Sequence, residues 1–301
     1  MAEQCSRRDF IGKTISTVSS VGLVSLLTSD TFSKPVSPAP SLKLGPKVGL
    51  VTYLLAKDWD VPTLIKNCTE AKFEGVELRT THAHKVETNL TAPERKEVKK
   101  RFEDSSVKLC SLGSAFEYHA VDPAEVKKNI DGTKEYILLA KDVGAEAVKV
   151  RPNGLQTAAG IPVEKTLEQI GRAARECAQF GKDNGIQVRM EIHGKETSRV
   201  PLMKKIIDYA DHDNFYVCWN SNETDLQDGG LESNFNLVKN KIAFVHMRDL
   251  FIEDYPWRKF FSLLNGMGYI GYCCAEIPES ADPIRVMKYY RALFMAYQNQ
   301  L

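Results

Sequence analysis

From residue 46 onward, short apolar runs alternate with longer segments whose apolar residues recur at a helical spacing. The runs have the length and the β-branched or aromatic content of buried strands. The expected strands cover residues 47–54, 75–79, 107–113, 145–151, 187–193, 215–220, 242–248 and 269–277.

Amphipathic helices are predicted between these strands, most clearly at 60–73, 122–144, 165–185, 200–212 and about 283–298. The helix at 122–144 begins at a capping aspartate and ends at a glycine. Eight strand–helix repeats between residues 46 and 301 suit a (β/α)8 or TIM barrel, an α/β fold. A doubly wound sheet would need fewer strands and usually a glycine-rich turn after the first one, which 55–62 lacks.

The first 45 residues do not follow this alternation. Arg7 and Arg8 precede a mildly apolar run, from about 15 to 27, that is too short to cross a membrane. SRRDFI, with Lys13 close behind, resembles a twin-arginine export signal, although a chance arginine pair is the alternative. We therefore expect a signal segment at 1–30, a disordered Pro/Ser-rich linker at 31–45 and the barrel at 46–301. The protein would be exported to a bacterial periplasm by the twin-arginine machinery, without stable membrane insertion.

Composition and charge mainly exclude some classes of function and of site. The formal net charge is +1 and 26% of the residues are charged, so no general attraction to nucleic acid is expected. The seven cysteines show no C-x-x-C spacing and fall mostly in apolar runs, as at Cys110, Cys218, Cys273 and Cys274. They are interpreted as buried thiols rather than as a disulfide framework or a zinc site.

Chemistry is expected where the strands end, because the site of a parallel barrel lies at the carboxyl ends of its strands. Glu191, Asn220, His246 and Glu276 lie there, separated by 29, 26 and 30 residues, or one strand–helix unit each. Such a set can surround one divalent ion and suits Mn²⁺, Mg²⁺ or Co²⁺, with Zn²⁺ also possible. The alternative is a metal-free network in which the two glutamates pair with Arg189, Arg248 or Lys149.

Further polar residues are expected on the same rim. Five of the six histidines lie at or just after a predicted strand end: His82, His84, His119, His193 and His246. Lys149 and Arg151, with Arg79 nearby, could bind a phosphate or carboxylate, or could instead pair with Glu77 or Glu191. The candidate substrate-binding residues are His193, Arg248, Trp219, Lys149, Arg151, Arg79, His82 and His119.

The strand ends EIHG, CWNSN, VHMRD and AEIPE, in this order, resemble the xylose isomerase-like TIM-barrel superfamily over about residues 46–301. That superfamily includes sugar-phosphate isomerases and epimerases, ketose 3-epimerases, inosose dehydratases and an apurinic endonuclease. In its epimerase branch a Glu, an Asp, a His and a second Glu hold the metal. Glu191, His246 and Glu276 match three of these positions, and Asn220 stands where the family usually has Asp. The resemblance thus implies a more weakly held ion, or a shell completed by a neighbour such as His193 or Asn222.

The resemblance implies a metal-dependent isomerase or epimerase that moves a proton next to a carbonyl of a sugar, keto sugar or cyclitol. Glu191 and Glu276 would be the catalytic acid/base pair. His193 and Arg248 would orient substrate hydroxyls. Trp219 would either offer a flat face to the sugar or serve ordinary barrel packing.

Two other functions remain open. A lyase could use the same groups to expel the aglycone of an oxidised glycoside by β-elimination. A barrel that has lost catalysis, as Asn220 would suggest, could only bind carbohydrate. A DNA-repair endonuclease is disfavoured because the chain lacks a basic patch. The exposed helices of such a barrel could pair copies of the chain into a homo-oligomer.

Overall fold

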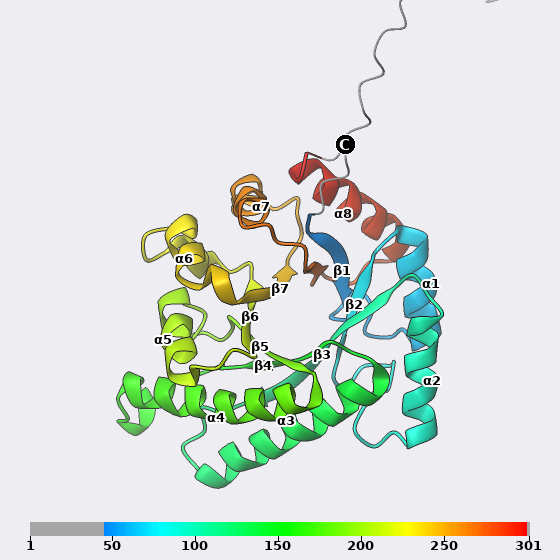
Figure 1. Cartoon of the computed structure of the whole chain (residues 1–301). Coiled ribbons are helices and arrows are strands. Elements are labelled where there is room, and N and C mark those ends of the chain that lie inside the picture. The colour runs from blue at the N-terminus through cyan, green and yellow to red at the C-terminus, as the bar shows by residue number, and fades with distance from the viewer. Residues whose placement is uncertain (1–44, 300–301) are drawn as a thin grey trace, which may run out of the picture. The chain divides into compact units, whose positions relative to one another are not determined.

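The computed structural model describes residues 45–299, which form a closed barrel of eight parallel strands surrounded by helices (Figure 1). Each strand pairs with its neighbours in chain order, and β1 closes the ring against β8. The predicted (β/α)8 fold is confirmed. The predicted signal segment at 1–30 and, apart from residue 45, the linker at 31–45 lie outside the described residues. The strands are β1 Lys47–Val51, β2 Gly75–Arg79, β3 Lys108–Glu117, β4 Ala147–Arg151, β5 Gln187–Glu191, β6 Phe215–Asn220, β7 Ile242–Met247 and β8 Tyr272–Ala275.

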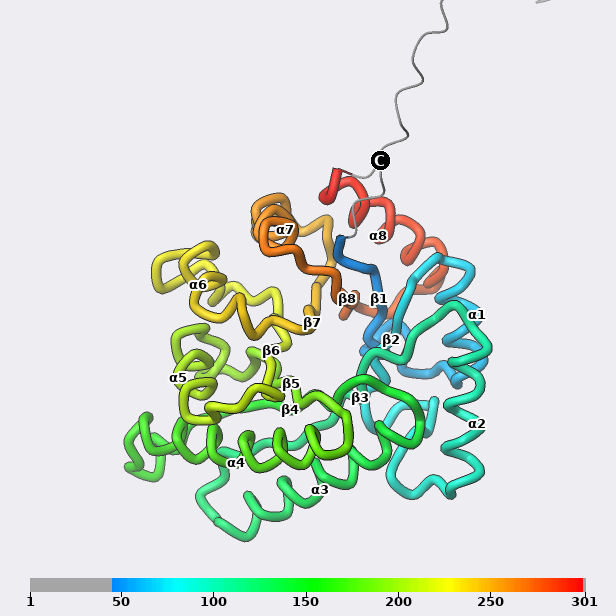
Figure 2. The backbone as a smooth tube through the Cα atoms, in the orientation of Figure 1, coloured from blue at the N-terminus to red at the C-terminus, as the bar shows by residue number. Residues whose placement is uncertain are grey.

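A helix follows every strand, so the tube in Figure 2 alternates between the inner ring and the outer layer. All five helices predicted by range are present, and α2, α6 and α7 complete the ring. Short 3-10 turns at Thr157–Ala159, Glu223–Leu226 and Lys239–Lys241 lie in the connections. The helices are α1 Val61–Ala71, α2 Ala92–Glu103, α3 Pro123–Val143, α4 Val163–Asn184, α5 Val200–Ala210, α6 Leu231–Val238, α7 Trp257–Gly266 and α8 Pro283–Tyr297.

Helix ends follow the sequence signals. Asp60 accepts a hydrogen bond from the Thr63 amide at the start of α1, and Asp122 accepts one from the Ala124 amide at the start of α3. Gly144 ends α3 in the left-handed conformation, with φ of 79°, which costs glycine little. The caps therefore fix where each helix returns the chain to the barrel.

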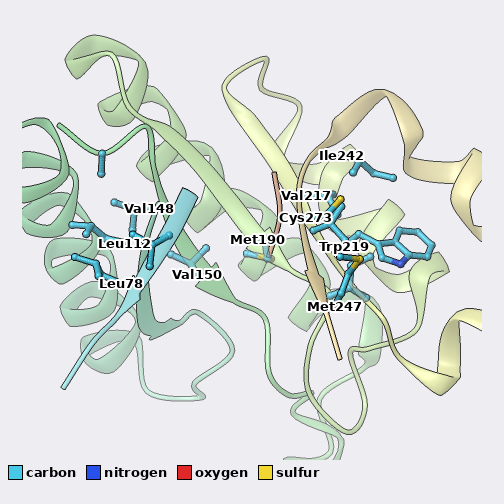
Figure 3. Packing of buried hydrophobic residues seen from close by; sticks show 14 of the residues in the cluster. Leu78, Leu112, Val148, Val150, Met190, Val217, Trp219, Ile242, Met247 and Cys273 are labelled. Carbon is cyan, nitrogen blue, oxygen red and sulfur yellow. The ribbon is translucent and has the colours of Figure 1, made fainter. Parts of the chain in front are cut away.

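The strands carry apolar residues on both faces, and the outer face packs against the helices. Figure 3 shows this layer, in which Leu78, Leu112, Val148 and Met247 belong to one continuous core. Among the described residues, no helix has the length and apolar character needed to cross a membrane.

The inside of the barrel holds a second, smaller cluster. Val51, Cys110, Cys218, Phe244 and Cys274 fill it, and Arg189 lies over the Phe244 ring, 5.0 Å from its centre. A Cβ atom on Gly49 would come within 2.5 Å of the Cys274 sulfur, so the strand leaves room for that thiol. The six cysteines in the described part of the chain are buried and free, as predicted. Apolar packing thus closes the barrel below its carboxyl end.

Candidate active site

Strand alternation brings four polar residues to the inside of the barrel, one step above the thiols. Glu77 comes from β2, Lys149 from β4, Glu191 from β5 and His246 from β7. All four are buried. Ionisable groups at such depth are stable only when they pair with one another or with a ligand.

His246 is at the centre of this group. Its Nε2 lies 3.1 Å from Oε1 of Glu77. Its Nδ1 lies 3.5 Å from Oε1 of Glu191 and 3.8 Å from Oε2 of Glu276, which follows β8. This Nδ1 is buried and has no hydrogen-bond partner among the described residues. One ring nitrogen is therefore held, and the other faces a gap between two carboxylates.

Glu191 has partners of its own. Lys149 donates from Nζ to Oε2 at 2.6 Å, and Asn220 donates from Nδ2 to Oε1 at 3.1 Å. Of the pairings considered in the metal-free alternative, that with Lys149 is present. Arg189 instead donates to Gln187, and Arg248 to Asp254.

The surrounding charges shift the pKa values of Glu191 and Glu276 in opposite directions. Burial raises the pKa of Glu191, but Lys149, His246 and His193 outweigh it and hold that pKa well below its usual value. Burial and the Glu191 carboxylate raise the pKa of Glu276 above its usual value. The Glu276 side chain is 20% exposed and that of Glu191 only 3%. Of the two acids, Glu276 is thus the more exposed and the one with the higher pKa.

The donor set fits a divalent metal ion. Glu191, His246 and Glu276 each offer one ligand atom, all within 4.8 Å of one another. Two atoms bound to one ion at about 2.1 Å each lie roughly 3 to 4 Å apart, which the distances from Nδ1 match. With Glu77 and Lys149 counted and His246 neutral, three carboxylates and one ammonium leave two negative charges for a divalent ion to balance.

Asn220 borders this set. Its amide nitrogen, not its oxygen, faces Glu191, so the amide would have to turn over to offer a ligand. Its place opposite His246 in the β6–β7 register keeps the oxygen within the site after such a turn. Three of the four predicted ligands are therefore grouped directly, and the fourth is adjacent.

Most of the predicted substrate-binding residues are part-exposed and lie at or just beyond the carboxyl ends of the strands. Nδ1 of His193 and Oδ1 of Asn153 are 2.6 Å apart, and Arg151 donates to Glu117 at 2.7 Å. Nδ1 of His119 lies 3.7 Å from the same Glu117. These residues, from β3, β4 and β5, form one polar wall of the mouth.

A second group extends from β2. The Arg79 guanidinium lies 5.1 Å from the centre of the Tyr53 ring, and Nδ1 of His82 lies 3.0 Å from the Thr52 hydroxyl. His84 is buried, bonds the Arg79 carbonyl oxygen and therefore supports the loop. Burial lowers the pKa of His193, and the cations Arg151, Lys149 and Arg79 lower it further against the opposing effect of Glu191.

Trp219 and Lys149 depart from the substrate-binding prediction. Trp219 is 0% exposed and lies on the outer face of β6, among the buried side chains of Figure 3. Its ring packs against Phe235 and Phe260. Side chains alternate along a strand, so Trp219 points outward between the inward Cys218 and Asn220. Ordinary packing, the alternative considered for Trp219, is what the structure has. Lys149 is buried against Glu191 and has no free face on the mouth.

Glu77 belongs to the site although sequence reasoning did not select it. It lies at a predicted strand end but was interpreted only as a partner for Lys149 or Arg151. The sequence feature that could have identified it is a single acidic residue inside the apolar run GVELR. The structure also makes room for it, because a Cβ on Gly113 would lie 2.7 Å from its Oε1.

Comparison with known proteins defines the family. The family model described as xylose isomerase-like TIM barrel matches residues 65–293, so the chain belongs to this family. No curated protein matches the sequence.

Solved structures share the fold at low sequence identity. A 3-keto-D-glucoside 4-epimerase, YcjR from E. coli, superposes with a TM-score of 0.69 at 12% identity, covering 83% of this chain and 99% of its own. An L-ribulose 3-epimerase gives 0.71 at 14%, covering 84% and 95%. The IOLI protein with a bound zinc atom gives 0.70 at 13%, covering 84% and 98%.

Proposed function

We propose that this chain is a metal-dependent sugar isomerase or epimerase that transfers a proton on a carbon next to a carbonyl group. The observation that carries the proposal is the grouping of Glu191, His246 and Glu276 around the unpartnered Nδ1 of His246. Family membership supports it, as do the structural neighbours, two of which are named as sugar epimerases and one of which holds zinc.

Glu191, His246 and Glu276 would hold the ion, with Asn220 as a fourth ligand once its amide turns. The bound ion would polarise the substrate carbonyl and so acidify the neighbouring carbon. Which of Mn²⁺, Mg²⁺, Co²⁺ or Zn²⁺ serves is an outcome of the test below.

The two glutamates have unequal parts in proton transfer. Glu276, which is partly exposed and has a raised pKa, takes the proton from one face of the carbon or delivers it. Glu191, held ionised by Lys149, acts on the other face. His193, Arg79, Arg151 and His119 orient the hydroxyls of the carbohydrate from the rim.

The first test is elemental analysis of the purified, folded protein, repeated on Glu276→Ala. We expect about one divalent ion per chain in the wild type and a large loss in the variant. An ion content that Glu276→Ala leaves unchanged, or no ion uptake even with added Mn²⁺, would refute the metal site. Glu279→Ala is a matched control, since that nearby carboxylate pairs with Lys57 outside the ligand set.

Activity is then assayed on ketohexoses and on 3-keto glucosides, the second because one structural neighbour is named for that substrate. Product analysis by NMR separates an epimer from a released aglycone, and so separates the epimerase from the lyase alternative. Binding of sugar without turnover would instead favour a non-catalytic carbohydrate-binding barrel.

Export is proposed separately, from Arg7 and Arg8. It is tested by replacing both with Lys and following the protein between cytoplasm and periplasm in a bacterial host. Unchanged export of the double variant would contradict a twin-arginine signal.

A further inference from the structure

Glu77 lies on the side of His246 that faces away from the proposed ion. The two nitrogens of an imidazole point in different directions from the ring. Nε2 is 3.1 Å from Oε1 of Glu77, while Nδ1 faces Glu191 and Glu276. Both members of the Glu77–His246 pair are 0% exposed. Glu77 is therefore out of reach of a substrate in the mouth, yet touches the ring that would bind the ion.

A wholly buried carboxylate is costly and needs a reason. The Lys149 ammonium, which helps to lower the pKa of Glu77, donates its hydrogen bond to Glu191 rather than to Glu77. Within residues 45–299, Oε2 of Glu77 has no hydrogen-bond partner. The direct contact that the Glu77 carboxylate makes is with His246, and Gly113 leaves the space that this contact requires.

We infer that Glu77 is the positioning residue of the metal-binding histidine. It accepts the Nε2–H of His246 and so fixes the tautomer whose Nδ1 lone pair faces Glu191 and Glu276. It also supplies a third carboxylate to a cluster whose fourth ligand position is the neutral Asn220. The effect on ion binding rests on the proposed function, whereas the tautomer does not.

The ion-binding consequence is tested with Glu77→Gln, which keeps the shape and removes the charge. Titration calorimetry with Mn²⁺ or Co²⁺ should show affinity about 10- to 100-fold weaker than in the wild type, as for other carboxylates behind a metal-bound histidine. The visible absorption of the Co²⁺ form should also change, because the histidine donor is altered. A purely structural role would leave that spectrum as it is.

Two variants accompany it. Glu77→Asp keeps the charge but shortens the reach, and should lie between the wild type and Glu77→Gln. Glu87→Gln is the matched control, because that half-buried carboxylate is held by Tyr136 and Thr80 and touches no ligand. Affinity and spectrum of Glu77→Gln within twofold of those of Glu87→Gln would overturn the inference.

The tautomer is read in the metal-free wild type, so a failed metal site does not stop the test. Long-range ¹H–¹⁵N NMR on a sample alkaline enough to hold a neutral His246 should place the ring proton on Nε2. A proton on Nδ1 would overturn the positioning role even if the ion binds. An Nε2 proton without any ion binding would leave the positioning role standing and refute the proposed function.

Discussion

Two buried networks, each containing an acid, lie on opposite sides of β6. The inner one joins Glu191 to Lys149 and His246. The outer one joins Asp225 to the hydroxyl of Tyr255, which accepts a hydrogen bond from Trp219. The two networks share one strand, because Trp219 and Asn220 are neighbours on it and point to opposite faces.

The two networks differ in what offsets the cost of burying the carboxyl group. In the inner one, a buried ammonium 2.6 Å away holds Glu191 ionised. In the outer one, burial raises the pKa of Asp225 to about 8, despite hydrogen bonds from Tyr255 and the Asn222 amide. Asp225 is therefore mostly protonated at neutral pH, because the Arg248 guanidinium, 5.6 Å from the centre of the Tyr255 ring, only partly offsets the effect of burial on that pKa. Both acids are buried, so burial alone does not explain the difference between them. Glu191 stays ionised because a lysine ammonium bonds it directly, and an ionised carboxylate can bind a cation.

The largest effect is expected on breaking the inner pair. Glu191→Gln leaves the Lys149 ammonium buried without its carboxylate, which costs about 3 to 5 kcal/mol of unfolding free energy. Chemical denaturation of the metal-free protein measures it.

Adding Lys149→Met to Glu191→Gln should recover part of this loss, since the ammonium that lost its partner is then removed as well. As a control, Glu164→Gln breaks an exposed pair with Lys205 and should change stability little. Equal losses in Glu191→Gln and Glu164→Gln would show that the inner pair is not desolvated as described.

In the outer network, the contribution of Asp225 to the free energy of unfolding should depend on pH. The folded-state pKa of Asp225 is about 8, above the value of 3.8 for a free Asp, so the folded state binds the extra proton. Its contribution to stability is complete below about pH 4 and is lost as the pH rises through 8. Between pH 5 and pH 8 the wild type should lose roughly 2 to 4 kcal/mol relative to Asp225→Asn, which carries no such proton.

Denaturation curves for the wild type and Asp225→Asn, taken in parallel at each pH, cancel the other titrating groups. Asp228→Asn, in the same connection, is the control: the hydrogen bond from Arg199 lowers the pKa of Asp228, so this group titrates only below about pH 4 and its difference from the wild type should stay constant between pH 5 and pH 8. A difference between the wild type and Asp225→Asn that does not vary with pH would mean that Asp225 is ionised when folded.

The same two networks show what the sequence can predict. Eight repeats and their spacing were sufficient for the barrel, and the regular step from Glu191 to Glu276 identified residues that come together, because a closed barrel brings successive strand ends to one rim. The sequence pattern does not say which partner a buried charge selects. For Lys149 the sequence left open a substrate group or a pair with Glu77 or Glu191, and the structure has the pair with Glu191. For Trp219 it left open a sugar contact or packing, and the alternation along β6 turns the ring outward into the packing layer. Glu77 stayed unassigned because its partner, His246, is 169 residues away.

Asn220→Asp would sharpen the comparison by adding a charge to the inner network. The resemblance of the strand ends implies that Asn220 stands where the epimerase branch usually has Asp, and its amide donates to Glu191 at 3.1 Å. In the metal-free protein, an Asp there repels Glu191 and lowers the free energy of unfolding. With Mn²⁺ bound the same carboxylate would become a ligand, so the affinity for Mn²⁺ should rise about tenfold, or about 1.4 kcal/mol.

The Asn220→Asp variant should thus melt below the wild type without Mn²⁺ and gain more in melting temperature from its addition. Thermal melting at several Mn²⁺ concentrations checks this, with the exposed Asn236→Asp as control. A gain no larger than that of the wild type would mean that residue 220 lies outside the ion's coordination shell and that three ligands suffice.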